Sequence, residues 1–184
     1  MTDNEISSWQ LFREDLETYV GKGWLPIQVL KGMFSLKYRF LLNVRIAHFF
    51  ARRRWLFIGP LLRWVCKVDM LVLFSSDIHC DAVWGRRVRI AHPLGIVVGA
   101  GVRIGDDCTL YQNVTLGARK HGEGKYPVLK EHVTIYAGAC CIGGICIGVN
   151  SVVGANAVLR DSCGDNAVII SQAIVHYRSH TSKQ

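Results

Sequence analysis

The sequence of 184 residues lacks the features that mark membrane-spanning and exported proteins. It contains no run of about 18 uninterrupted apolar residues, the length that a helix needs to cross a bilayer. Its beginning, MTDNEISSWQLFREDLE, is polar and acidic, whereas a signal peptide has basic residues followed by an apolar stretch. We therefore expect a protein that is made in the cytoplasm and stays there.

The sequence also lacks the cysteine spacing of a disulfide framework or a zinc site. Its seven cysteines include no pair separated by two residues, and the chain is longer than small secreted domains. Cys140 and Cys141 are adjacent, which suits the tetrahedral coordination of zinc poorly. We expect reduced thiols that pack as small apolar side chains, and no bound metal.

Acidic residues are absent between Thr18 and Val68, where ten basic residues lie among large aromatic ones. The basic residues are Lys22, Lys31, Lys37, Arg39, Arg45, Arg52, Arg53, Arg54, Arg63 and Lys67. Two interpretations of residues 18–68 remain open. One is a helical surface that lies on anionic lipid head groups, and the other is a helical cap with a solvated basic face. Nucleic acid is not an expected partner, because no known binding module matches.

From about Val83 the sequence repeats every six residues. Val102, Cys108 and Val114 are spaced by six, and a second register begins at Val133. The second register contains Val133, Ala139, Ile145, Ser151 and Ala157. This period differs from the 3.6 residues of a helix and the two residues of a simple strand. It is typical of a parallel β-helix, in which three six-residue units form one coil.

The composition and the repeat together predict one main domain with flanking segments. Half of the residues are hydrophobic, so the chain can bury a core. We divide it into a helical, basic and apolar segment (1–76), the β-helix (77–170) and a tail (171–184). The stretch ARKHGEGKYP at 118–127 is too polar to continue the repeat. We expect it to protrude as a functional loop, although a tolerated surface insertion is the alternative.

One ionisable ring, His92, lies in the stretch RIAHPLGIVVGAGVRIG at 89–105. Asp77 precedes it by 15 residues, so a coil of about 18 residues places the two on neighbouring coils about 4.8 Å apart. A carboxylate bonded to one imidazole nitrogen would fix the tautomer and make the other nitrogen a better base. From the spacing alone, a histidine satisfied within the core is the more common arrangement.

Residues 77–117 resemble the catalytic half of the serine acetyltransferases, which belong to the left-handed β-helix, hexapeptide-repeat acyltransferases. The resemblance is carried by DIH at 77–79, AHPLGIVVG at 91–99 and QNVTLG at 112–117, and it continues to about Ala157. It implies a mainly β fold, a left-handed parallel β-helix preceded by a small α-helical segment. It also implies a homotrimer or a dimer of trimers, with acetyl-CoA as the co-substrate.

The resemblance assigns roles to individual residues. His92 would be the general base that takes the proton of the acceptor hydroxyl, and Asp77 would orient it. Acetyl-CoA would lie in a groove between neighbouring prisms, with its contacts made largely by the backbone. The corresponding positions are Gly117, Ala118, Ala137 and Ala155.

Three departures from the family pattern bear on the substrates, the first two on the acceptor and the third on the last CoA contacts. Ala91 stands where the family has an aspartate that binds serine, and Lys125 and Tyr126 stand where it has an Arg-His pair. The tail sequence VIISQAIVHY replaces the usual Gly-x-Pro-Ala. Because the ammonium of an amino acid needs a carboxylate, the absence of one at position 91 argues against free serine.

The segment YRFLLNVRIAHFFARRR at 38–54 is similar to acetyltransferases of bacterial polysaccharide gene clusters, such as the colanic acid enzymes. We therefore expect acetylation of a saccharide hydroxyl in surface polysaccharide synthesis. The segment 18–68 would then bring the enzyme to the inner membrane face, through Arg52, Arg53 and Arg54 in particular. The alternatives are a serine acetyltransferase of cysteine synthesis and a non-catalytic β-helix scaffold that binds a membrane or partners.

Overall fold

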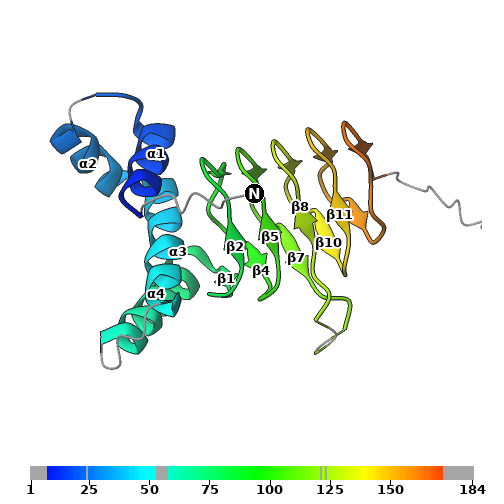
Figure 1. The fold of residues 1–184 in the computed structure, drawn as a ribbon, viewed down its shortest axis with the longest axis horizontal. Coiled ribbons are helices and arrows are strands. Elements are labelled where there is room, and N and C mark those ends of the chain that lie inside the picture. The colour runs from blue at the N-terminus through cyan, green and yellow to red at the C-terminus, as the bar shows by residue number, and fades with distance from the viewer. Residues whose placement is uncertain (1–7, 24, 53–57, 121, 123, 172–184) are drawn as a thin grey trace, which may run out of the picture.

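The computed structural model describes residues 8–23, 25–52, 58–120, 122 and 124–171. Four helices at one end are followed by a long stack of short strands (Figure 1). The helices are α1 (Ser8–Val20), α2 (Leu25–Phe34), α3 (Leu36–Arg52) and α4 (Ile58–Phe74). Among the described residues, no helix is both long and apolar enough to cross a membrane.

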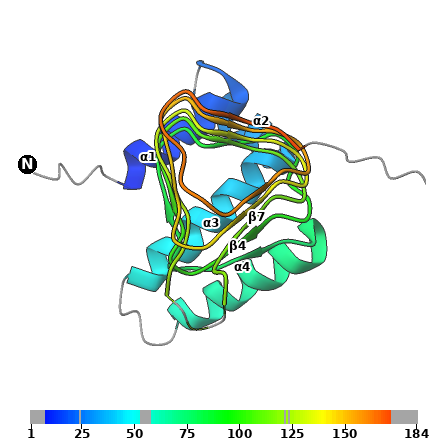
Figure 2. The same cartoon turned by 90° about the vertical axis from the view of Figure 1, so that its right-hand side faces the viewer.

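The strands form three parallel sheets, which we call faces 1, 2 and 3. Face 1 contains β1 (Asp77–Ile78), β4 (Val97–Val98), β7 (Thr115–Gly117), β10 (Cys140–Ile142) and β13 (Val158–Leu159). Face 2 contains β2 (Val83–Trp84), β5 (Arg103–Ile104), β8 (Val128–Leu129) and β11 (Cys146–Ile147). Face 3 contains β3 (Arg89–Ile90), β6 (Thr109–Leu110), β9 (Thr134–Ile135), β12 (Val152–Val153) and β14 (Val168–Ile169). From β1 to β13 each strand pairs with the third strand along the chain, whereas β12 pairs with β14, and Figure 2 shows the resulting triangular prism. The predicted parallel β-helix with N-terminal helices is confirmed.

The six-residue repeat places its side chains inside this prism, as predicted. Val102, Cys108 and Val114 are fully buried, and so are Val133 and Ala139 of the second register. Burying one aliphatic side chain of this size is worth about 1.5–3 kcal/mol, so the stacked columns stabilise the prism. The thiols behave as expected of small apolar groups, because burial raises the pKa of both Cys108 and Cys141 to about 12.

The coils differ in length, contrary to the uniform 18 residues that we expected. Asp77 lies beside Val97, a step of 20 residues, and Val97 lies beside Thr115, a step of 18. Thr115 then lies beside Cys140, a step of 25, because residues 118–127 leave the prism between β7 and β8. Figure 1 shows this segment protruding from the stack.

The helices pack on the first coil and form a cap. Phe40 of α3 packs edge-on against Phe74 of α4, with ring centroids 5.4 Å apart. Arg45 of α3 donates to the carboxylate of Asp15 in α1 (2.8 Å) and to the backbone oxygens of Trp84 and Gly85 (3.0 and 2.6 Å). Arg45, one of the ten basic residues between Thr18 and Val68, therefore connects α3 to α1 and to the first coil and is not part of a solvated face.

The boundaries of the three predicted segments stay predictions. The described helices end at Phe74 and the strands begin at Asp77, whereas Ser171 is the last described residue of the chain. Arg53, Arg54 and the sequence beyond Ser171 lie outside the described residues.

Candidate functional site

His92 lies in the turn between β3 and β4, on the edge of the prism that joins face 3 to face 1. We call this the histidine edge; it comprises residues 91–96, 111–114, 136–139 and 154–157. The first of these turns has six residues and the second has four. The two additional residues make this coil 20 residues long instead of 18, and the longer turn projects from the prism. His92 is accordingly exposed, so it is not a core histidine.

The backbone of this turn is held from both sides. The N–H of Ala91 donates to Leu110 O (2.8 Å) in the next coil, and the N–H of Gly95 donates to Phe74 O (2.9 Å) at the end of α4. Gly95 has φ +66°, and a Cβ atom there would overlap the side-chain oxygen of Asn113. Glycine is thus required at this position, and the histidine turn is a rigid support.

An aromatic column extends from His92 along the histidine edge. The His92 and Tyr111 ring centroids are 6.2 Å apart with the planes tilted by 55°. Tyr111 stacks on Tyr136 of the following coil at 4.8 Å and 27°. These tyrosines could not be found from the six-residue repeat, because they align with the histidine turn only when coils of 20 and 25 residues are allowed.

Asp77 is the first residue of β1, and it lies beside the histidine turn on the neighbouring coil. Its N–H donates to Ile96 O (3.0 Å), and the hydroxyl of the buried Ser76 accepts the N–H of Ile96 (3.0 Å). The carboxylate is 58% exposed, and Lys67 Nζ lies 4.0 Å from it. Within the described part of the chain, no hydrogen bond joins the Asp77 carboxylate to the His92 ring. The two residues are on adjacent coils as predicted, whereas the orienting contact stays a prediction.

The predicted acetyl-CoA positions fall on two different edges. Ala137 and Ala155 lie on the histidine edge, in successive coils. Gly117, the last residue of β7, and Ala118 lie at the opposite side of face 1. We call this side the loop edge; it comprises residues 79–82, 99–102, 118–127 and 143–145. A strand of face 1 separates the two sets in one chain. The structure therefore brings Ala137 and Ala155 to the side of His92, but not Gly117 and Ala118.

The predicted acceptor residues are also divided between the edges. Ala91 adjoins His92, whereas Lys125 and Tyr126 belong to the loop edge. The Tyr126 ring lies across Gly99 and Gly101, where a Cβ atom on Gly99 would come within 2.7 Å of it. Tyr126 therefore anchors the protruding loop on the preceding coil, and Lys125 is exposed beside it.

Among the described residues, one cluster of side chains could offer metal ligands, although we expected no metal. His79, Cys80 and Asp81 place ligand atoms within 4.8 Å of one another on the loop edge. The guanidinium of Arg63, however, donates to the Cys80 sulfur at 3.1 Å. Because the Arg63 guanidinium already places a positive charge at the Cys80 sulfur, it would repel a metal cation there. The cluster therefore does not favour metal binding.

Known proteins provide an independent comparison. No family model matches the chain. A serine acetyltransferase of Helicobacter pylori is 39% identical over 120 residues, which are 65% of this chain and 68% of that protein. Serine acetyltransferase isoform 3 of Entamoeba histolytica, solved with cysteine, superposes with a TM-score of 0.72 at 25% identity, over 96% of this chain and 62% of that one. A serine acetyltransferase solved with CoA gives a TM-score of 0.71 at 28% identity, over 88% and 66%.

These findings correct the expected acceptor. The prediction of a saccharide acceptor in polysaccharide synthesis is wrong, because the relatives are serine acetyltransferases, and the similarity to colanic acid enzymes is not supported. The prediction rested on Ala91, on Lys125 and Tyr126 and on the similarity of residues 38–54, and the identity to a serine acetyltransferase over 120 residues outweighs these local departures. The chain belongs to the serine acetyltransferase family, and it is an enzyme of the acetyl-CoA-dependent acyltransferase class.

Proposed function

We propose that the protein transfers the acetyl group of acetyl-CoA to the side-chain hydroxyl of L-serine, giving O-acetylserine and CoA. The observation that carries this proposal is the 39% identity to the Helicobacter pylori enzyme over about two thirds of both chains. The relative solved with CoA supports the acetyl donor.

We assign the proton transfer to His92. Its ring is exposed on a turn whose backbone is fixed at Ala91 and Gly95, so an acceptor hydroxyl can reach it. As the hydroxyl oxygen attacks the thioester carbon, His92 takes the hydroxyl proton, the C–O bond forms and the C–S bond then breaks. The proton held by His92 passes to the departing thiolate of CoA. Asp77 would accept a hydrogen bond from the other ring nitrogen and hold the tautomer.

We propose that the complete site forms between two copies of the chain, in a trimer or a dimer of trimers of left-handed prisms. The proposed acetyl-CoA contacts lie on both edges of face 1, which one groove along one edge cannot reach together. Side-by-side copies would bring the loop edge of one chain to the histidine edge of the next. Exposed apolar side chains on face 1, among them Val97 and Val158, support a contact at this face.

We further propose that the enzyme is cytoplasmic and contacts anionic lipid through residues 18–68. Leu30 (57% exposed) and Phe34 (82% exposed) project from α2 together with the exposed Lys31, which is the combination that favours a lipid surface. Flotation with anionic liposomes tests this contact, and a protein that stays entirely unbound would rule it out.

The enzymatic proposal is tested by following CoA release with L-serine as the acceptor and identifying the product by mass spectrometry. We expect CoA and O-acetylserine in equal amounts, and little release with D-serine or without an acceptor. Release of CoA at the same rate with and without L-serine would show that serine is not the acceptor.

A further inference from the structure

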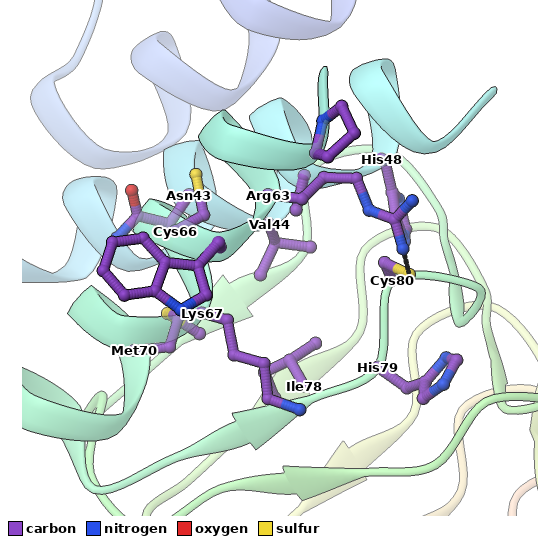
Figure 3. Close-up of a pocket in the computed structure, with 13 residues that line it drawn as sticks. Asn43, Val44, His48, Arg63, Cys66, Lys67, Met70, Ile78, His79 and Cys80 are labelled. Atoms are coloured by element: carbon purple, nitrogen blue, oxygen red, sulfur yellow. Dashed lines mark hydrogen bonds between the residues drawn. The ribbon is translucent and has the colours of Figure 1, made fainter. Parts of the chain in front are cut away.

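A cavity of about 370 Å³ lies between the helical cap and the first coil, at the foot of the loop edge (Figure 3). Its walls come from α3, α4, β1 and the segment that follows β1. The lining residues are Asn43, Val44, Ala47, His48, Pro60, Arg63, Trp64, Cys66, Lys67, Met70, Ile78, His79 and Cys80. The volume falls in the range of ligand pockets, and neither His92 nor any proposed acetyl-CoA contact lines it.

The charge of this cavity is one-sided. Arg63 and Lys67, one turn apart on α4, both line it, and no aspartate or glutamate does. Asp69 of α4 is already paired, since it accepts hydrogen bonds from Arg39 (2.6 Å) and Asn43. A ligand that enters the cavity therefore meets positive charge without a competing carboxylate in the lining.

Within the described residues Arg63 has no carboxylate partner, whereas Lys67 forms a loose ion pair with Asp77. Arg63 reaches across to Cys80, as Figure 3 shows, and donates to its sulfur at 3.1 Å, although a thiol is a weak acceptor. Lys67 extends beside Ile78, and its amine lies 4.0 Å from the Asp77 carboxylate, beyond hydrogen-bond distance. A carboxylate can accept hydrogen bonds from both cations, and such charge-assisted bonds are among the stronger ones.

The remaining walls of the cavity are mostly apolar. Val44 and Met70 are buried in the helical cap, and Ile78 closes the side that faces the prism. An inorganic anion would leave this apolar surface uncovered, whereas an aliphatic chain attached to a carboxylate would cover it.

We propose that this cavity is a binding site for a small organic carboxylate with a short aliphatic body. The carboxylate binds Arg63 and Lys67, and the aliphatic body contacts Val44, Met70 and Ile78. The lining includes neither His92 nor Asp77, although Lys67 lies 4.0 Å from the Asp77 carboxylate, and occupancy of the cavity does not depend on which acceptor the enzyme uses.

Isothermal titration with sodium butanoate, at fixed ionic strength, tests the proposal. We expect saturable binding by the full-length protein, and no binding of butan-1-ol or butan-1-amine, which have the same chain without the negative charge. Arg63→Gln and Lys67→Gln should each weaken binding at least fivefold. Lys120→Gln, which removes an exposed positive charge outside the cavity, is the matched control and should leave binding unchanged.

A second variant separates the cavity from general effects of charge or misfolding. Ala47→Leu adds bulk to the lining without changing charge, and it should weaken butanoate binding while circular dichroism and thermal unfolding confirm the fold. His92→Ala should still bind butanoate. The absence of saturable binding would overturn the proposal, as would equally tight binding of inorganic phosphate or competition by L-serine or CoA. A failure of serine acetylation would leave this measurement unaffected, so the two proposals fail separately.

Discussion

The two edges that flank face 1 are built in different ways. The histidine edge keeps short turns and alternates Gly95, Asn113, Gly138 and Asn156 at positions of positive φ. The loop edge is interrupted by residues 118–127 and carries exposed cations. Under the proposed function, one edge would hold the reacting group in a fixed position, whereas the other edge would supply charges that contact substrates.

The largest effect should follow from removing the proposed base on the histidine edge. His92→Asn should lower kcat by about 10²–10⁴-fold, the usual contribution of a general base, with CoA release as the measurement. Because His92 is exposed, the thermal midpoint of unfolding should not change. Unchanged turnover would remove His92 from the mechanism.

The rigidity of the histidine edge is tested by a methyl group at Gly95. Gly95→Ala should reduce the free energy of unfolding by about 1–3 kcal/mol, because the added Cβ overlaps Asn113 at a positive φ. Urea titration measures this. The matched control is Gly122→Ala on the loop edge, where φ is +78° but a Cβ would have no neighbour within 4 Å. Equal losses in both variants would show that the histidine edge is no more constrained than the loop.

The aromatic column offers a smaller test of the same edge. Tyr111→Leu should lower kcat several-fold with little change in KM, because the ring that contacts His92 is lost. Tyr111→Phe keeps the ring and should have the kcat and the pH profile of the wild type. A similar loss in both variants would assign the effect to the hydroxyl instead of to ring packing.

A substitution on the loop edge should change KM for L-serine and leave kcat unchanged. Lys125→Gln should raise KM for L-serine about two- to fivefold with kcat unchanged, the size expected for an exposed charge contact. The control is Lys120→Gln, at an exposed residue of the same loop, and it should leave KM for L-serine unchanged. A fall in kcat for Lys125→Gln would argue against the separate roles of the two edges.

The smallest effect concerns the third edge, which joins faces 2 and 3 and has no proposed role in catalysis. Arg87 donates to Asp107 (2.6 Å), and this hydrogen bond lowers the pKa of the Asp107 carboxyl from its usual 3.8. Because the pKa of Asp107 is lower in the folded state than in the unfolded state, the ionised carboxylate stabilises the fold above pH 3.8. This contribution is lost as the pH falls from 3.8 through the lowered pKa. Asp107→Asn should therefore cost at most about 1 kcal/mol at pH 7, since the pair is partly exposed, and nothing at pH 2. A loss that is independent of pH would contradict this origin.

Much of the fold could be predicted from the repeat, because the inward positions of a β-helix must be small or apolar. Val102, Cys108 and Val114 illustrate this, and all three are buried. Coil length could not be predicted, since extra residues in a turn leave the inward pattern intact. The tyrosines beside His92 were missed for that reason. The spacing did place Asp77 and His92 on neighbouring coils, but it could not give the orientation of the two side chains.

Other parts of the site depend on contacts that are distant in the sequence. Arg45 belongs to a basic stretch, yet its partners Asp15, Trp84 and Gly85 lie in α1 and the first coil. The acceptor was misjudged from a few departures from the family pattern, Ala91 among them, because single positions do not show which other groups face a bound acceptor. The cavity between Arg63, Lys67 and Ile78 likewise requires the packing of α4 on β1.

The most direct test of the account is the initial rate of CoA release as a function of L-serine concentration, for the wild type and His92→Asn side by side. The account predicts saturation by L-serine in the wild type, with O-acetylserine as the product, and a loss of at least a hundredfold in the variant. A wild-type rate that does not depend on L-serine, or a variant as fast as the wild type, would contradict it.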